Sequence, residues 1–187
     1  MSLPHDRTIS LREFYTLREK TDDLLEYSDG IVFMTPSPST KHQRISGRLH
    51  AKLFHFLDGS GCEVFHAPFD VELQSKNAEE KHIVIPDLLV ICNKSGLSDN
   101  KFSGAPDLII EILSPSNQSH DLVYKLNLYM QAGVKEYWIV NPMLHIIQVY
   151  QLDPNGQYQQ VDALKETGII TSTILNGFQV NLDEIFA

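Results

Sequence analysis

The amino-acid sequence predicts an α/β domain in which a mixed β-sheet is flanked by helices. Two apolar segments, Ile83–Cys92 and Leu108–Leu113, are rich in Leu, Ile and Val and too short for long helices. Such segments are typical of strands buried on both faces. Helical patterns at Thr40–Leu57 and Ser116–Ala132 flank this pair along the chain. This order of elements favours a mixed sheet covered by helices over a β-sandwich.

The N-terminal part is expected to contain a helix, a hairpin and the long first core helix. Ser10 and Glu13 have the spacing of a capping box, and Asp29-Gly30 has the composition of a hairpin turn. The expected elements are a helix from Leu11 to about Lys20, the strands Leu24–Ser28 and Ile31–Thr35, and the helix Thr40–Leu57.

The rest of the chain alternates strands with one further helix. Ser75–Lys81 and Asn93–Gly104 are polar and are expected to form connections, whereas Gly133 is placed to end the helix Ser116–Ala132. The remaining strands are expected at Cys62–His66, Phe69–Gln74, Lys135–Val140, His145–Leu152, Gln157–Val161 and Gly168–Leu175.

Composition and charge narrow the functional classes. With 187 residues and 42% hydrophobic residues, the chain is expected to form one domain over residues 1–187. A net charge of -9 weighs against a sequence-independent nucleic-acid binder, because phosphate contacts need basic groups. Carboxylates gathered around bound cations would account for part of that charge.

Cysteine usage and hydropathy bear on the compartment. Cys62 and Cys92 are too few for a disulfide framework and have no zinc-site spacing. The sequence contains neither a signal-peptide pattern nor an apolar run long enough to cross a bilayer. We therefore expect a cytoplasmic protein that does not associate with membranes.

Two carboxylates interrupt the apolar segments. Asp87 follows Pro86, and Glu111 lies between Ile110 and Ile112. An ionised carboxylate in a buried strand needs a cation, hydrogen-bond donors or access to water. A shared metal ion would serve both residues. The pattern alone leaves open a second interpretation, in which each acid caps a loop or pairs with its own lysine.

Other polar residues carry weaker signals. Asp121 and Lys125 are four positions apart on one helix face, a spacing that usually adds only a few tenths of a kcal/mol to helix stability. Asp107 is expected at a sheet edge. Tyr137 and Trp138 alternate on one strand and indicate core and surface packing rather than base stacking.

Three stretches together resemble the Uma-two family of endonucleases. They are Ile85-Pro86-Asp87-Leu88-Leu89, the run from Gly104-Ala105-Pro106-Asp107 through Glu111-Ile112-Leu113-Ser114-Pro115-Ser116, and Ala132-Gly133-Val134-Lys135-Glu136-Tyr137-Trp138-Ile139-Val140. Upstream, Glu26–Gly30, Ser37–Ile45 and Ala67–Val71 also look like the family's pattern. The resemblance covers roughly residues 10 to 152.

The resemblance implies a restriction-endonuclease-like core of the PD-(D/E)xK type, with an added N-terminal helix and hairpin. It implies that Asp87 and Glu111 bind Mg²⁺ (or Mn²⁺) with help from the backbone carbonyl of Ile112. Most such nucleases place a lysine two positions after the second acid, but Leu113 occupies that position here.

The resemblance instead makes Lys125 the candidate lysine, with Asp121 orienting it. It further suggests Glu26 and His42 as supporting residues. His42 lies at the start of a helix, so it could equally be an exposed polar residue.

The resulting hypothesis is a Mg²⁺-dependent endonuclease that hydrolyses phosphodiester bonds of nucleic acid, with DNA as the favoured partner. The alternative is a nuclease-fold module with little or no cleavage that binds a nucleic acid or a protein. The acidic composition and Leu113 favour that alternative. The oligomeric state stays open, a homodimer included.

Overall fold

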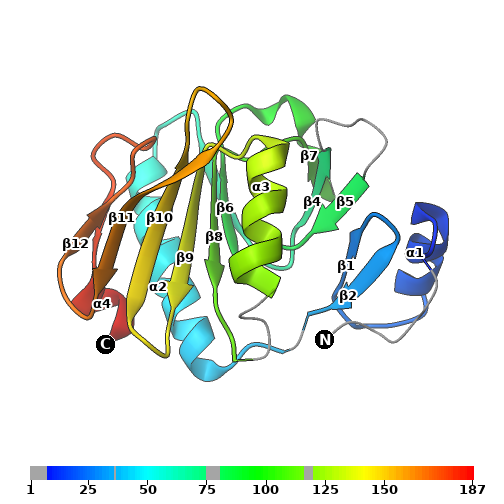
Figure 1. Ribbon diagram of the computed structural model, residues 1–187, viewed down its shortest axis with the longest axis horizontal. Coiled ribbons are helices and arrows are strands. Elements are labelled where there is room, and N and C mark those ends of the chain that lie inside the picture. Colours follow the sequence, from blue (N-terminus) through cyan, green and yellow to red (C-terminus); the bar gives the residue numbers. More distant parts are fainter. Residues whose placement is uncertain (1–7, 36, 75–80, 116–119) are drawn as a thin grey trace.

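The computed structural model describes residues 8–35, 37–74, 81–115 and 120–187, with the side chains of 120–122 left out. Its centre is a six-stranded sheet with α2 on one side and α3 on the other (Figure 1). The helices are α1 (Leu11–Arg18), α2 (Thr40–Leu57), α3 (Leu126–Ala132) and α4 (Leu182–Phe186), with a π-helical turn at His120–Lys125 and a 3₁₀ turn at Lys94–Gly96.

The strands form two larger sheets and one small one. In spatial order, the six-stranded sheet is β11 (Tyr158–Lys165), β10 (Ile146–Leu152), β9 (Glu136–Asn141), β8 (Leu108–Ile112), β6 (Leu88–Ile91) and β3 (Glu63–His66). The five-stranded sheet is β2 (Ile31–Met34), β1 (Leu25–Ser28), β5 (Lys81–Val84), β4 (Asp70–Gln74) and β7 (Lys101–Ser103). The small sheet pairs β12 (Ile169–Thr171) with β13 (Gln179–Asn181).

The sheets are mixed, as the sequence predicts. In the six-stranded sheet β8 runs parallel to β9, and in the five-stranded sheet β4 runs parallel to β7, while the other pairs are antiparallel. Apolar side chains of α2, such as Leu49 and Leu53, pack on one face of the six-stranded sheet. Leu128 and Tyr129 of α3 pack on the other face, together with residues of β4, β5 and β7.

Several local predictions are confirmed. Ser10 and Glu13 form the capping box at the start of α1. Asp29 and Gly30 both have positive φ, at 44° and 90°, as the tight turn between β1 and β2 requires. Gly133 ends α3 in the left-handed conformation with φ 88°.

The prediction of one continuous strand over Ile83–Cys92 is wrong. The segment divides into β5 and β6, which belong to different sheets. Pro86 lies at the break, where its missing N–H and fixed φ disfavour a ladder position inside a sheet. Asp87 therefore lies directly before β6 rather than in the middle of a strand.

Three further segments differ from expectation. The helix predicted over Ser116–Ala132 begins, within the described residues, as the π-helical turn and becomes α-helical only at Leu126. The polar connection Asn93–Gly104 contains the 3₁₀ turn and β7. The strand predicted over Gly168–Leu175 is limited to β12, and α4 was not anticipated.

Cys62 and Cys92 form a disulfide. The composition argument, which took two cysteines as too few for a disulfide framework, did not anticipate this single bridge. Its origin is the register of β3 and β6, in which Glu63 lies opposite Ile91 and the two cysteines follow at the next pair of positions. Among the described residues, no helix is long and apolar enough to cross a membrane.

Candidate active site

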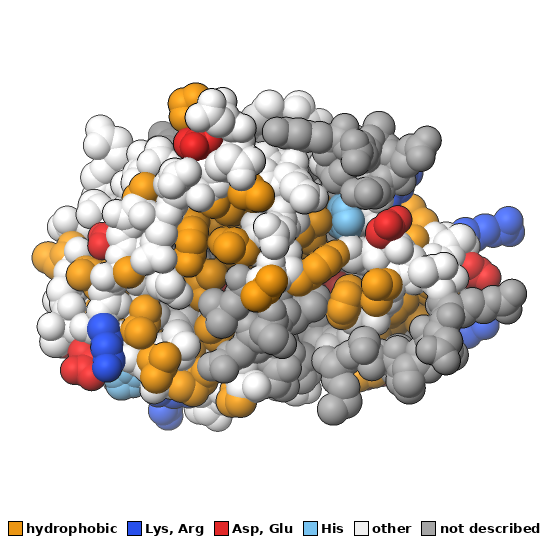
Figure 2. All heavy atoms as spheres, in the orientation of Figure 1, with side chains coloured by type: hydrophobic (Ala, Val, Ile, Leu, Met, Phe, Trp, Pro, Cys, Tyr) orange, Lys and Arg blue, Asp and Glu red, His pale blue; other side chains and the backbone are white. Residues whose placement is uncertain are grey.

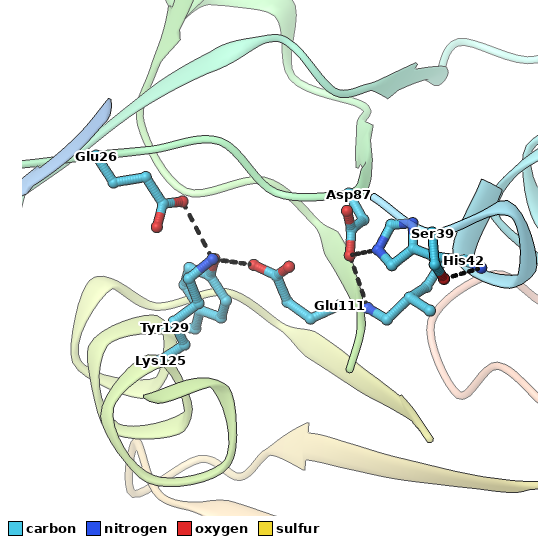
Figure 3. A network of polar contacts seen from close by, with 8 residues as sticks. Glu26, Ser39, His42, Asp87, Glu111, Lys125 and Tyr129 are labelled. Atoms are coloured by element: carbon cyan, nitrogen blue, oxygen red, sulfur yellow. Dashed lines mark hydrogen bonds and ion pairs between the residues drawn. The ribbon is translucent and has the colours of Figure 1, made fainter. Parts of the chain in front are cut away.

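Lys125 lies between two glutamates from different sheets. Its Nζ atom donates to Glu111 Oε1 at 2.8 Å and to Glu26 Oε1 at 3.1 Å. Glu111 comes from β8 and Glu26 from β1, and all three side chains are at most 7% exposed. Figure 3 shows the ammonium group of Lys125 lying between the two carboxylates. The fold thus brings together three residues that are far apart along the chain.

Tyr129 is a fourth member of this cluster and was not singled out from the sequence. Its hydroxyl donates to Glu111 Oε1 at 2.6 Å, and its ring is fully buried. Burial, together with the negative charge of Glu111, raises the pKa of Tyr129 well above its ordinary value. The phenol therefore stays protonated at neutral pH and keeps donating to the carboxylate.

The positions of these side chains follow from local structure. Tyr129 lies four residues after Lys125, so both project from the same side of the helix toward β8. The spacing of four residues could have indicated that Tyr129 lies beside Lys125, but Tyr129 also fits the apolar stripe of α3. Glu26 also accepts a 2.8 Å hydrogen bond from the backbone N–H of Ile85, which connects β1 to the break between β5 and β6.

Asp87 is fixed by a second set of contacts. Its Oδ2 atom accepts hydrogen bonds from the backbone N–H of Ile112 at 2.8 Å and from His42 Nε2 at 3.1 Å. His42 lies in the first turn of α2, where Ser39 caps the backbone N–H of His42 at 3.2 Å. Continuing the register of β6 and β8 from Leu88 opposite Ile110 places Asp87 beside Glu111.

The two acids nevertheless have different partners. In Figure 3 the carboxylate of Glu111 is directed toward Lys125 and Tyr129, while that of Asp87 is directed toward His42. Lys125, the candidate lysine, therefore contacts Glu111 and Glu26. The side chain of Asp121 lies outside the described residues.

A buried hydrogen-bond chain adjoins the cluster. Ser28 Oγ lies 2.6 Å from His82 Nδ1 and also contacts the hydroxyl of Tyr124, the residue before Lys125. Ser28 and His82 are paired across β1 and β5, so the chain connects the five-stranded sheet to the π-helical turn. The sequence contains no distinct signal for any of the three, since Ser28 and His82 are single polar residues in short strands and Tyr124 lies in the π-helical turn.

The cluster places two carboxylate side chains, Glu26 and Glu111, around the single ammonium group of Lys125. The described residues contain no group of three or more His, Cys, Asp or Glu side chains that could hold a metal. Mg²⁺ does not need one, since it is usually held by one or two carboxylates and retains several waters.

Other polar and aromatic residues have structural contacts. Asp107 precedes β8 and accepts hydrogen bonds from the backbone N–H of Cys92 at 2.7 Å and from Lys135 at 2.6 Å. Tyr137 and Trp138 are both fully buried on opposite faces of β9, so the expected surface packing of one of them is wrong.

Comparison with known proteins agrees with this architecture. A family model described as "Uma2: Putative restriction endonuclease" matches residues 11–183. An uncharacterized protein of Synechocystis sp., slr1290, is 28% identical over 163 residues and covers 84% of each chain. A crystal structure from Anabaena variabilis, described as "a putative nuclease belonging to DUF820", superposes with a TM-score of 0.76 at 20% identity, covering 95% of this chain and 97% of that one.

The structural similarity establishes a fold shared with that protein, and the family match extends over nearly the whole chain. Residues 11–183 include every strand named above, the candidate cluster around Lys125 and the Asp87–His42 pair. The chain belongs to the Uma2 family, described as putative restriction endonucleases.

Proposed function

We propose that the protein is a metal-dependent nuclease that hydrolyses phosphodiester bonds of nucleic acid, with DNA as the favoured substrate. The observation that carries the proposal is the placement of Lys125 between Glu26 and Glu111, inside the protein and at β8, the strand that pairs with β6 directly after Asp87. Buried acids are costly to keep unless they are paired or hydrogen-bonded, and this cluster brings two of them to one ammonium group.

Asp87, Glu111 and the backbone carbonyl of Ile112 are the oxygen donors that would hold Mg²⁺ or Mn²⁺. When bound, the ion would neutralise charge on the scissile phosphate and lower the pKa of the attacking water. In this proposal Asp87 keeps its orientation through the N–H of Ile112 and through His42.

Lys125 and Tyr129 have separate tasks in the proposal. The ammonium group of Lys125 would hydrogen-bond the attacking water or a phosphate oxygen and offset the negative charge that develops there. Tyr129 would hold Glu111 in one orientation through its 2.6 Å hydrogen bond. Glu26 would retain Lys125 in place when Glu111 turns to its other partners.

A second function is favoured by one specific observation. Asp87 already accepts hydrogen bonds from His42 and from the N–H of Ile112. A side chain satisfied in this way needs no metal, as expected for a nuclease-fold module that binds a nucleic acid or a protein partner without cleaving it.

Cleavage and metal binding distinguish the two functions. The purified protein is incubated with supercoiled plasmid, linear duplex DNA, single-stranded DNA and RNA, each with Mg²⁺, Mn²⁺ or EDTA. The nuclease predicts metal-dependent cleavage that Lys125→Ala largely abolishes, with Lys165→Ala as the control because Lys165 is 62% exposed on β11. The absence of cleavage with every metal, and of any thermal stabilisation by Mn²⁺, would refute it.

A further inference from the structure

Helix α2 is the only helix or strand of the described residues with four Lys or Arg side chains, and it contains no acidic residue. The chain as a whole has 24 acidic and 15 basic residues. The positive charge of α2 is therefore a local exception on an acidic protein. Its four members are Lys41, Arg44, Arg48 and Lys52.

The four basic residues lie along one flank of the helix. They are three, four and four positions apart, which is the spacing of neighbours on a helical surface. The flank is adjacent to the apolar stripe that packs on the sheet, represented by Ile45 and Leu49. At about 1.5 Å per residue, Lys41 and Lys52 are about 16 Å apart along the helix axis.

The basic flank begins at the candidate active site. His42, in the first turn of α2, contacts Asp87, and the preceding residue Lys41 donates to the backbone oxygen of Pro142. Lys41 Nζ also lies 3.2 Å from His145 Nε2, in the turn between β9 and β10. In Figure 1 this end of α2 lies near the ends of β8 and β9, where Ile112 and Asn141 are located.

Two of the four basic residues have intramolecular partners along α4. Arg48 donates to the backbone oxygens of Ile185, at 3.0 Å, and of Ala187, and Lys52 forms an ion pair with Glu184. Arg44 is exposed and makes no hydrogen bond or ion pair with a described residue. Lys41 and Arg44 lie at the active-site end of the flank. Lys41 already donates to the backbone oxygen of Pro142, so the exposed Arg44 is the residue best placed to bind a partner, and Lys41 would add a second positive charge beside it.

Among the side chains that the structure describes, the face that carries α3 shows no comparable tract (Figure 2). In Figure 2 Lys and Arg side chains appear toward the ends of that face and hardly at all over its middle, where hydrophobic side chains gather. A polyanion approaching the acidic protein is attracted where the positive charge is concentrated.

We propose that Lys41 and Arg44 bind the phosphodiester backbone of a nucleic acid and hold the strand across the Asp87 end of the site. This inference rests on the proposed function and specifies the surface by which the substrate is held. The expected ligand is a phosphodiester polyanion, because the contact is made by two positively charged side chains, three residues apart, and depends on their charge. Binding is expected to be independent of sequence and sensitive to salt.

The test measures binding without cleavage. Fluorescence anisotropy in EDTA follows the full-length protein with a labelled duplex DNA, the single strand and the matching RNA, at several salt concentrations. Arg44→Ala is the principal variant, since Arg44 is exposed and makes no hydrogen bond or ion pair with the part of the chain that the structure describes. Lys41→Ala and the double variant extend the series, and Arg12→Ala and Lys165→Ala are matched controls on α1 and β11.

Each lost phosphate contact should reduce the slope of log K against log salt by about 0.9 on duplex and about 0.7 on single strands. We expect a loss of about one contact for Arg44→Ala, about two for the double variant and none for the controls. Slopes that are unchanged in all variants, or reduced equally in the controls, would overturn the proposal. Equal binding of poly-glutamate, with the same losses, would overturn it in favour of an acidic protein partner.

The outcome can be separated from that of the proposed function. If the wild-type protein fails to cleave with any metal but Arg44→Ala still reduces the salt slope, the nuclease activity fails and the binding surface stands. If cleavage is present and the slope is unaffected, the surface fails and the nuclease activity stands.

Discussion

Replacing Tyr129 by phenylalanine removes one hydroxyl group and leaves the packing of the ring in place. The ring is fully buried and contacts Tyr137 edge-on, with the ring centroids 5.1 Å apart. The lost interaction is the 2.6 Å hydrogen bond to Glu111 Oε1. Hydrogen bonds to charged groups contribute about 1.5–3 kcal/mol, so the free energy of unfolding at pH 7 should fall by about that amount.

The dependence of stability on pH above 10 gives a sharper test, because the raised pKa of Tyr129 fixes the direction in which stability changes. The pKa of Tyr129 is raised in the folded protein, whereas in the unfolded chain the phenol ionises near pH 10. Its contribution to stability is fully present below about pH 10 and is lost as the pH rises further toward the folded value. The difference in the free energy of unfolding between the wild type and Tyr129→Phe should therefore decrease above pH 10, by about 1.4 kcal/mol per pH unit.

Urea unfolding followed by circular dichroism, at constant ionic strength from pH 7 to 11, measures this difference. Tyr150→Phe is the control at neutral pH, because within the described ranges the Tyr150 hydroxyl has only neutral hydrogen-bond partners, Gln148 and Gln160, each at 3.3 Å. The control should lose less than Tyr129→Phe. A difference in the free energy of unfolding that stays constant or widens up to pH 11 would refute the raised pKa of Tyr129, and the absence of any loss at pH 7 would refute the hydrogen bond to Glu111. Titration of Mn²⁺ on the same variants tests whether the loss of the bond also weakens metal binding through Glu111.

Three further predictions follow from buried charges and from the disulfide. Lys125→Met leaves Glu26 and Glu111 without their ammonium partner and should lower the free energy of unfolding by about 3–5 kcal/mol, measured by urea unfolding; a change below 1 kcal/mol would contradict the buried ion pair. Reduction of the Cys62–Cys92 disulfide, which closes a loop of sequence separation 30, should lower stability by about 3–4 kcal/mol, and a double Cys→Ala variant should not respond to reductant. Glu136→Gln should speed amide exchange at Thr173 and Ile174, whose N–H groups donate to its carboxylate, and unchanged exchange there would exclude the contact.

Elements with strong local signals were predictable from the sequence. The capping box of α1 and the positive φ at Gly133 depend on a few neighbouring residues. The break before Asp87 was missed although Pro86 supplied a local reason for it, because the apolar run continues on both sides. Apolar composition indicates burial, but it does not tell to which sheet each half of a segment belongs.

In the C-terminal part, prediction from the sequence is limited by long-range contacts. Glu136 is fully buried in β9 and accepts hydrogen bonds from Trp138 Nε1 at 2.7 Å and from the N–H of Thr173 at 2.6 Å. This contact crosses 37 residues and holds the turn before β13. Long-range contacts between a buried acid and backbone N–H groups have no periodicity in the sequence, so β13 and α4 could not be located from pattern alone.

The candidate site shows how Lys125 reaches Glu111 from the helix that covers β8. A residue two positions after Glu111 lies on the same face of β8 by strand alternation, and that residue is Leu113. Leu113 is buried with Ile109 and with Leu128 of α3, so this face is covered by the helix rather than open to solvent. The helix that covers the face also carries Lys125 at its start, and the ammonium group of Lys125 donates to Glu111 from the helix side of β8. Leu113 and Lys125 therefore have complementary roles at the same helix. Leu113 packs against the helix in the core, and Lys125, at the start of the helix, brings the positive charge to Glu111. The same reasoning predicts that Leu113→Lys would not substitute for a missing Lys125, because it would place its ammonium group among buried apolar side chains.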